Sequence, residues 1–105
     1  MMTFFPLEKM HRLFDGYIRP FNVAGHQLLL VQSEGVLHLI ENRCPHMGAA
    51  LTHATLKGNV LRCPSHGFEY DLRSGQPARE VFIAGGGRLR HFALAYEGNQ
   101  VGIFV

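Results

Sequence analysis

The sequence predicts an all-β protein built from two antiparallel sheets, arranged as a sandwich or partial barrel. Short runs of apolar and β-branched residues recur along the chain, and Gly, Asn, Ser or Asp residues separate them. Apolar and polar residues alternate near the end of the chain, while helical periodicity is almost absent. Strands at this spacing are typical of sandwiches and barrels, and 105 residues suit one domain.

The elements follow from these patterns in chain order. Residues 7–14 place four larger side chains on one side and would make one or two helical turns, or an irregular segment. A glycine lies in or beside the turn after most of the expected strands, and Glu97-Gly98-Asn99 predicts a closing hairpin. We expect strands at 17–23, 27–32, 36–41, 60–62, 68–71, 92–96 and 101–105.

The composition excludes several classes of protein. With 47% hydrophobic and 17% charged residues, the chain is neither disordered nor membrane-like, and no apolar run approaches a membrane span of about 18 residues. Residues 1–15 do not form a secretory signal, which favours a cytoplasmic protein. Ten basic and eight acidic residues without a long basic run argue against nucleic-acid binding.

Two short segments hold the only cysteines and predict a metal site. Each contains one thiol and one imidazole, with sixteen residues between the segments: Cys44-Pro45-His46 and Cys63-Pro64-Ser65-His66. Two thiolates and two imidazoles are the ligand set of one type of 2Fe–2S cluster. The prolines stiffen the two loops, and Gly48 and Gly67 permit tight turns that leave backbone N–H groups free to bond sulfur.

Two other interpretations of these residues remain. Zinc accepts two cysteines and two histidines, but its usual sites pair cysteine with cysteine and histidine with histidine, at different spacings. A nucleophilic cysteine activated by a histidine would need only one of the two segments. The other five histidines have no partner at ligand spacing, so we expect them to be surface or packing residues: His11, His26, His38, His53 and His91.

The pattern C-P-H-x16-C-P-S-H-G, continued by Phe68 to Asp71, resembles the Rieske family over essentially the whole chain. The resemblance implies that Cys44 and Cys63 bind one iron of a single 2Fe–2S cluster, and His46 and His66 the other. It also implies one Rieske domain over residues 1–105, in which two β-sheets carry a small cluster-binding subdomain of two loops at about 42–77.

The departures from the high-potential Rieske proteins of respiratory complexes are informative. Ala49 and Ser65 stand where those proteins have the cysteines of a disulfide, so that bridge is absent here. Phe68 stands where those proteins have a serine that bonds a cluster sulfide, and Tyr70 stands where they have a tyrosine that bonds a ligand sulfur. Fewer hydrogen bonds stabilise the reduced cluster less, which predicts a low-to-intermediate potential. The three glycines of Ala84-Gly85-Gly86-Gly87 suggest a flexible cover over the cluster.

The resemblance is strongest to the stand-alone Rieske ferredoxins, which carry single electrons from a flavoprotein reductase to a terminal oxygenase. We therefore expect an electron carrier that does not turn over substrate itself, because the chain has no dinucleotide fingerprint and no second domain. The alternatives are a fixed electron-relay subunit of a larger oxidoreductase, such as a nitrite-reductase-like assembly, and an iron or redox sensor. The oligomeric state stays open.

Residues around the ligands suggest where a partner docks. Pro45, Met47, Pro64 and Ser65 would form an apolar rim, although Met47 is as well explained by core packing. Arg43 and Arg62 immediately precede the two cysteines, with two further basic residues, Lys57 and Arg73, nearby in the sequence. These charges form either a solvated face or a surface that steers the protein toward an acidic partner.

Overall fold

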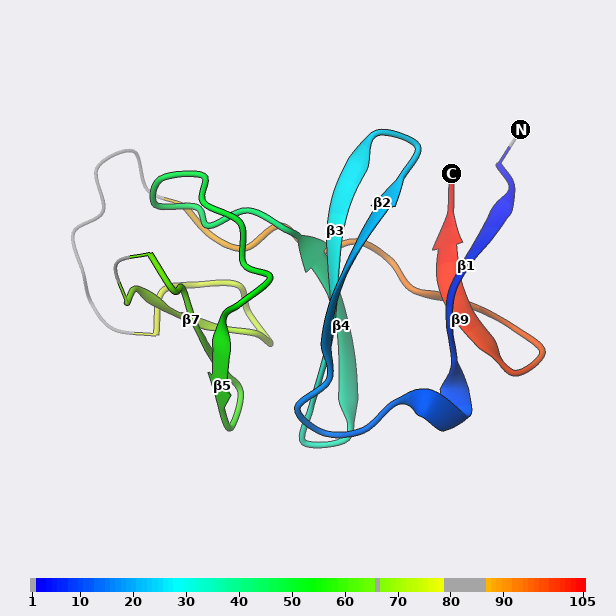
Figure 1. Cartoon of the computed structure of the whole chain (residues 1–105), viewed down its shortest axis with the longest axis horizontal. Helices are drawn as coiled ribbons and strands as arrows, with labels where there is room; N and C mark the ends of the chain where they lie inside the picture. The colour runs from blue at the N-terminus through cyan, green and yellow to red at the C-terminus, as the bar shows by residue number, and fades with distance from the viewer. Residues whose placement is uncertain (1, 66, 79–86) are drawn as a thin grey trace.

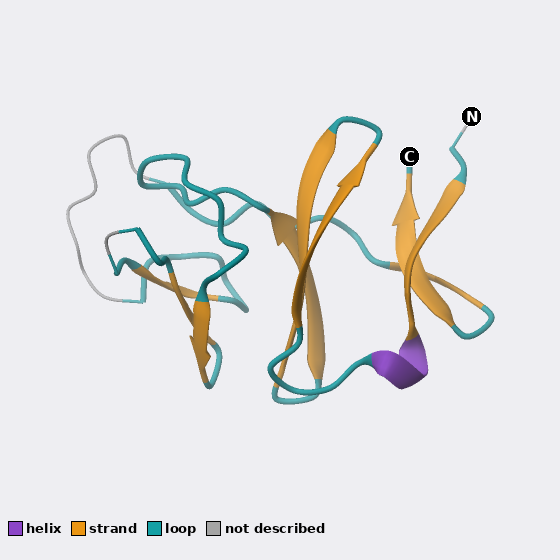
Figure 2. Cartoon of the chain, viewed as in Figure 1, coloured by secondary structure: helices purple, strands orange, loops and turns teal. Residues whose placement is uncertain are grey.

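The computed structural model describes residues 2–65, 67–78 and 87–105. Strands dominate this part of the chain, with a single 3₁₀-helix, η1, after the first strand (Figure 2). The elements are β1 (Phe4–Lys9), η1 (Met10–Arg12), β2 (Ile18–Val23), β3 (His26–Ser33), β4 (Val36–Glu41), β5 (Thr55–Lys57), β6 (Val60–Arg62), β7 (Glu69–Asp71), β8 (Ala95–Glu97) and β9 (Gln100–Phe104).

The described strands form three antiparallel sheets of three strands each, in the orders β1-β9-β8, β2-β3-β4 and β5-β6-β7. Figure 1 shows the sheet β2-β3-β4 in the middle, with β1 and β9 on one side and the small sheet β5-β6-β7 on the other. The first two sheets form a base. The third belongs to the insertion between β4 and β8, which also carries both cysteine loops.

The middle strand of the central sheet, β3, is buried on both faces over residues 28–31, which explains its continuous apolar run. Leu28 and Leu30 pack with Val101 of β9 in one core, whereas Leu29 and Val31 pack with both cysteines in the other. Successive side chains of a strand point to opposite faces, so in a strand between two cores both sets of side chains are apolar and no polar residues alternate with them. The cysteine loops therefore rest directly on the base.

Two tight hairpin turns set the register of the central sheet. Ala24-Gly25 joins β2 to β3 and Glu34-Gly35 joins β3 to β4, and all four residues have positive φ, between 50° and 80°. Two-residue loops with both residues in the left-handed region match the right-handed twist of the strands that they connect. The register of both hairpins is regular along the strands.

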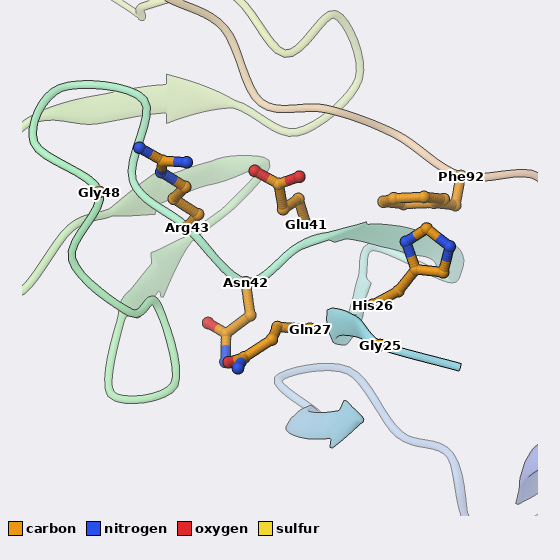
Figure 3. Close-up of a pocket in the computed structure, with 8 residues that line it drawn as sticks. All are labelled: Gly25, His26, Gln27, Glu41, Asn42, Arg43, Gly48 and Phe92. Carbon is orange, nitrogen blue, oxygen red and sulfur yellow. The ribbon is translucent and has the colours of Figure 1, made fainter. Parts of the chain in front are cut away.

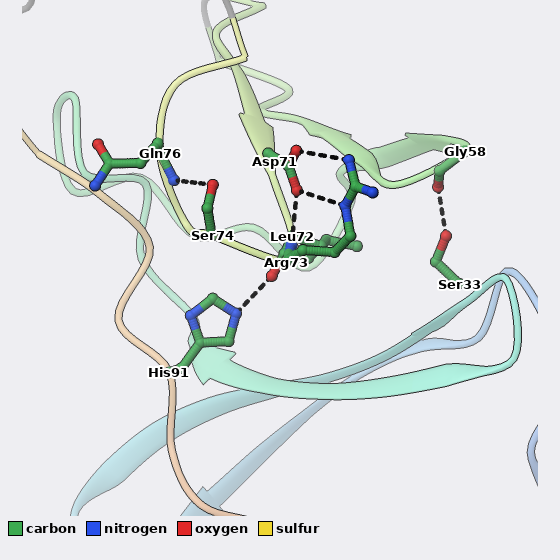
Figure 4. Close-up of polar contacts among 8 residues, drawn as sticks. All are labelled: Ser33, Gly58, Asp71, Leu72, Arg73, Ser74, Gln76 and His91. Atoms are coloured by element: carbon green, nitrogen blue, oxygen red, sulfur yellow. Dashed lines mark hydrogen bonds and ion pairs between the residues drawn. The ribbon is translucent and has the colours of Figure 1, made fainter.

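The cysteine-bearing subdomain is tied to the base by polar contacts. The Asn42 side chain accepts a hydrogen bond from the Leu51 N–H at 2.7 Å and donates one to the Thr52 hydroxyl at 2.9 Å. A ring nitrogen of His91 lies 2.6 Å from the Leu72 carbonyl, and the Ser33 hydroxyl donates to the Gly58 carbonyl (Figure 4). The Ser33 bond connects the subdomain to β3 and the His91 bond connects it to the segment before β8, while the Asn42 bonds hold the chain that leaves β4 against residues 51 and 52.

A buried carboxylate links the other two sheets. Glu8 of β1 is only 7% exposed, and it accepts hydrogen bonds from the Tyr17 hydroxyl at 2.8 Å and from Arg19 at 3.2 Å. Burial alone would raise the pKa of Glu8, but these bonds, the Lys9 N–H and nearby arginines hold it below its ordinary value. Burial and the bond to Glu8 raise the pKa of Tyr17 to about 12. The pair fixes β1 against the start of β2.

The prediction of an all-β fold is confirmed, and the strands expected at 36–41 and 60–62 have those bounds. For 7–14, where one or two helical turns or an irregular segment were expected, both alternatives are wrong for residues 7–9, which belong to β1, and Met10–Arg12 form one helical turn. Sequence reasoning also missed β5 and the third sheet that it begins. In the described part of the chain, no helix has the length and apolar character needed to cross a membrane.

Candidate metal centre

The two cysteine loops have the same backbone frame. The Cys44 N–H donates to the Ala49 carbonyl at 2.7 Å, and the Gly48 N–H donates back to the Cys44 carbonyl at 2.7 Å. In the second loop the Cys63 N–H donates to Phe68 at 2.8 Å and the Gly67 N–H to Cys63 at 3.0 Å. Sequence accounts for this match, because residues 43–49 read RCPHMGA and residues 62–68 read RCPSHGF.

Each loop turns at a glycine that an arginine side chain covers. Gly48 and Gly67 have φ of 76° and 72°, a conformation that L side chains rarely adopt. A Cβ on Gly48 would lie 3.0 Å from Arg43 Nε, and one on Gly67 would lie 2.8 Å from Arg62 Nη2. The arginine before each cysteine therefore folds back onto the turn of its own loop, an arrangement that sequence reasoning did not foresee.

Both predicted cysteine ligands are buried in the same core. Cys44 and Cys63 are each 1% exposed and are free thiols. The hydroxyl of Tyr70, which is fully buried, lies 4.0 Å from Cys44 Sγ. Burial raises the pKa of Tyr70, and the two thiols raise it further, so that the hydroxyl keeps its proton beside the sulfur.

The predicted histidine ligands are placed differently. His46 is half-buried, and its ring stacks on Phe68 of the other loop, with centroids 3.8 Å apart and planes 28° apart. His66 lies outside the described residues. Within residues 2–65, 67–78 and 87–105, no group of three or more His, Cys, Asp or Glu side chains is close enough to hold a metal ion. The structure thus brings two thiols and Tyr70 into one core, and it stacks one imidazole against the opposite loop.

The predicted docking rim is mostly exposed. Met47 is 67% exposed, and Pro64 and Ser65 are also exposed, whereas Pro45 is half-buried. A Cβ on Gly87 would lie 2.6 Å from Pro45 Cβ, so the returning chain packs tightly on this proline. The rest of the predicted glycine cover, 84–86, lies outside the described residues.

A pocket of about 380 Å³ opens beside the first loop (Figure 3). It lies between the β2–β3 turn, the end of β4 and the segment that leads to Cys44. One wall is aromatic, because the rings of His26 and Phe92 meet edge to face at 5.6 Å. The residues that line it are Gly25, His26, Gln27, Glu41, Asn42, Arg43, Gly48 and Phe92. No sequence pattern pointed to this pocket.

Comparison with known proteins places this geometry in a family. The Rieske 2Fe–2S domain family matches residues 3–82. The chain belongs to the Rieske family. Its Rieske fold spans the base and the inserted subdomain, and both cysteine loops lie within the matched residues.

The Rieske chain is similar to ferredoxin components of oxygenase systems. It is 32% identical over 90 residues to the ferredoxin component of the alkene monooxygenase system of Xanthobacter autotrophicus, and the match covers 85% of this chain and 70% of that protein. The chain spans only 10–16% of the length of four other curated relatives.

Solved structures show the same fold. The ferredoxin of carbazole 1,9a-dioxygenase from Nocardioides aromaticivorans superposes with a TM-score of 0.79 at 21% identity, covering 96% of each chain. A chain in the complex of reduced oxygenase and oxidised ferredoxin in carbazole 1,9a-dioxygenase gives a TM-score of 0.80 at 24% identity, covering 96% of this chain and 100% of that one. The prediction of a Rieske fold is confirmed.

The residues present fit a Rieske-type 2Fe–2S cluster, the cofactor that the family implies. Thiolates are the soft ligands that iron–sulfur clusters need, and two free thiols meet here in one core without forming a disulfide. The Tyr70 hydroxyl near Cys44 Sγ is a neutral donor that suits an anionic sulfur ligand.

Proposed function

We propose that this Rieske protein is a one-electron carrier that receives electrons from a flavoprotein reductase and passes them to a terminal oxygenase. The observation that carries the proposal is the 32% identity to a monooxygenase ferredoxin component across 85% of the chain. When bound, the 2Fe–2S cluster takes up one electron and releases it again. The protein is an electron-transfer component that does not turn over substrate by itself.

We propose that Cys44 and Cys63 bind one iron and that His46 and His66 bind the other. The matched backbone frames of the two loops and the burial of both thiols support this assignment. The stack of His46 on Phe68 favours one orientation of the imidazole, which restricts its side-chain freedom before any ligand binds.

The second part of the proposal concerns the reduction potential of the cluster, the domain, its compartment and the surface that docks the partner. Ala49 and Phe68, both half-buried against the cysteine-containing core, supply neither a disulfide nor a hydroxyl donor, and Tyr70 is one polar group close to a ligand sulfur. A low-to-intermediate potential follows. We further propose that residues 1–105 work as a single domain, with its cluster subdomain at about 42–77, in the cytoplasm. Met47, Pro64 and Ser65 would contact the partner beside the ligands.

A redox titration followed by EPR tests the function and the ligands together. The purified protein should be reddish-brown, contain two irons and two acid-labile sulfides, and give a rhombic one-electron signal with an average g below two. Changing Cys44 or Cys63 to Ser, or His46 or His66 to Ala, should abolish that signal. His53→Ala, which changes an exposed histidine of the same subdomain, should leave the signal intact. Colourless protein with stoichiometric zinc would contradict the proposal.

A further inference from the structure

We propose that the guanidinium groups of Arg43 and Arg62 form a basic collar beside the two cysteine loops, and that this collar binds a carboxylate-rich surface of the redox partner. The inference rests on the proposed function as an electron carrier, and it adds the chemistry of the partner surface.

The positions of the two guanidinium groups are set by the loops themselves. Both side chains are exposed, yet each lies against the turn of its own loop, within about 3 Å of where a Cβ on Gly48 or Gly67 would be. Because the turn glycines leave this space open, each long side chain has a surface to lie along rather than extending freely into water. An arginine that is partly ordered in advance loses less side-chain entropy when it binds a carboxylate.

The formal net charge of the molecule lies in the subdomain that carries these loops. Residues 42–78 contain four basic and two acidic residues, while the rest of the chain has six of each, so the formal charge of +2 lies in the subdomain. Among the described residues, Arg43 and Arg62 form no ion pair, whereas Arg12, Arg19, Arg73 and Arg90 each pair with a carboxylate. The collar therefore provides positive charge where the cysteines are held, with Glu69, the register partner of Arg62 on β7, as the neighbouring acidic residue.

Each arginine also lines a recess beside its loop. Arg43 contributes to the pocket of about 380 Å³ in Figure 3, where the nearby Glu41 carboxylate lies 3.6 Å from Arg90 and is partly neutralised. Arg62 lines a smaller recess of about 160 Å³ with His53 and Pro64. A carboxylate side chain is small enough to enter either recess, and a guanidinium can bind it through two parallel hydrogen bonds.

Such a collar would act mainly on the rate of association and on the choice of partner. Charge near the docking site attracts an oppositely charged surface and repels a like one, and salt weakens both effects. The bound cluster does not cancel the collar, because an oxidised core of charge +2 with two thiolates and two neutral imidazoles adds no net charge. Reduction lowers the total by one.

The experiment measures oxidation of the reduced, cluster-loaded protein by stopped flow, with two small oxidants of opposite charge. Ferricyanide represents the carboxylates of a partner, and tris(phenanthroline)cobalt(III) represents a basic surface. Changing Arg43 or Arg62 to Gln should slow ferricyanide oxidation about threefold at low salt and flatten its decrease with salt, while the cobalt complex should react faster. Poly-glutamate should slow the ferricyanide reaction of the wild type. It should not slow the reaction of the double variant in which both Arg43 and Arg62 are changed to Gln.

Matched variants distinguish the effect of charge at Arg43 and Arg62 from the effects of total net charge and of side-chain packing. Lys57→Gln removes one charge from the same subdomain but at the β5–β6 hairpin, away from the cysteine loops, and should change the rates much less (Figure 1). Arg43→Lys and Arg62→Lys keep the charge and should keep the wild-type salt dependence. An intact EPR signal in every variant shows that the cluster is unaffected.

The proposal of a basic collar would be overturned if Lys57→Gln changed the rates as much as Arg43→Gln and Arg62→Gln do. It would also be overturned if the ferricyanide rates did not depend on salt. Neither result would touch the proposed carrier function, because a reversible one-electron signal would still be present. Loss of that signal in the wild type would instead contradict the carrier function itself.

Discussion

The two cysteine loops share the same backbone hydrogen bonds, but their surroundings differ. In both, the cysteine N–H, the cysteine carbonyl and the glycine N–H make equivalent hydrogen bonds, and an arginine covers the turn. Cys44 has the Tyr70 hydroxyl 4.0 Å away. The second loop ends in Phe68, whose ring lies across the first loop's histidine.

This difference shows how two loops with the same backbone frame can form a site whose two halves have different side chains. The shared residues, Arg-Cys-Pro and the glycine, define the shape of each loop, while the variable positions decide which side chain faces the core and which faces solvent. In the first loop the residue two after the cysteine is the half-buried His46, and the next is the exposed Met47. We therefore expect the first loop to need its histidine at position 46 and not at position 47.

The largest effect should come from moving that histidine. The double variant His46→Ser, Met47→His gives the first loop the spacing of the second, and we expect it to lose the Rieske EPR signal and most of its iron. The reason is that a side chain at 47 is 67% exposed, whereas the ring at 46 lies against Phe68. Met47→Leu alone should keep both. Normal iron content and normal g values in the double variant would show that the two spacings are interchangeable.

The next effect concerns the turns of both loops. Gly48→Ala and Gly67→Ala should each destabilise the cluster-loaded protein by about 1–3 kcal/mol, because both residues have positive φ and a new Cβ would also displace an arginine. Gly98→Ala is the matched control, since its φ is 58° but no other group lies within 4 Å of a new Cβ. Anaerobic denaturant titration measures all three. A larger loss for Gly98→Ala would exclude crowding by the arginines.

A smaller effect, on the midpoint potential, should come from the tyrosine hydroxyl that lies near the cysteine sulfur of the first loop. Tyr70→Phe removes the hydroxyl near Cys44 and should lower the midpoint potential by about 50 mV, which corresponds to roughly 1 kcal/mol for one electron. Tyr17→Phe removes the other buried tyrosine hydroxyl, which bonds Glu8, and should leave the potential unchanged. A potential that is the same in Tyr70→Phe and the wild type would mean that this hydroxyl does not bond the sulfur.

The smallest effect should appear outside both loops, at the base. His38 is buried, and in the described part of the chain its Nε2 has no hydrogen-bond partner. Burial, with His91 adding to it, lowers the pKa of His38, although Asp71 opposes this.

Because the folded protein resists protonation of His38, this residue costs stability as the pH falls below its ordinary pKa of 6.5. His38→Leu should flatten the acid side of a plot of unfolding free energy against pH, without changing the EPR signal. The exposed His53→Ala should leave that acid side as it is in the wild type. An identical acid limb in His38→Leu and the wild type would contradict the prediction.

Much of the base could be predicted from the sequence, because its strands are long enough to show a pattern. The run in β3 and the glycine turns beside it locate the central sheet. The strand β1 was missed because Pro6 normally argues against a strand. It is accommodated since β1 lies at the edge of its sheet and its register shifts after Pro6. Three-residue strands such as β5 are too short for periodicity to reveal.

At the candidate site, local sequence revealed the chemistry but not the arrangement. The cysteine and histidine segments were recognisable because residue type and spacing are local properties. The fold of Arg43 and Arg62 onto the glycines, and the stack of Phe68 on His46, depend on how segments meet in space. The pocket beside Asn42 depends on the packing of three separate segments, which no single stretch encodes.

The position of β9 between β1 and β8 has a consequence for the order of folding. Phe4 pairs with Phe104, one hundred positions later, so the first strand of this sheet has no partner until the last strand has been synthesised. Contacts of such large sequence separation slow folding, because the chain must close a long loop before it gains the pairing energy. On the ribosome, both cysteine loops emerge before their base is complete. The cysteine loops are thus synthesised before the strand that completes the base beneath them.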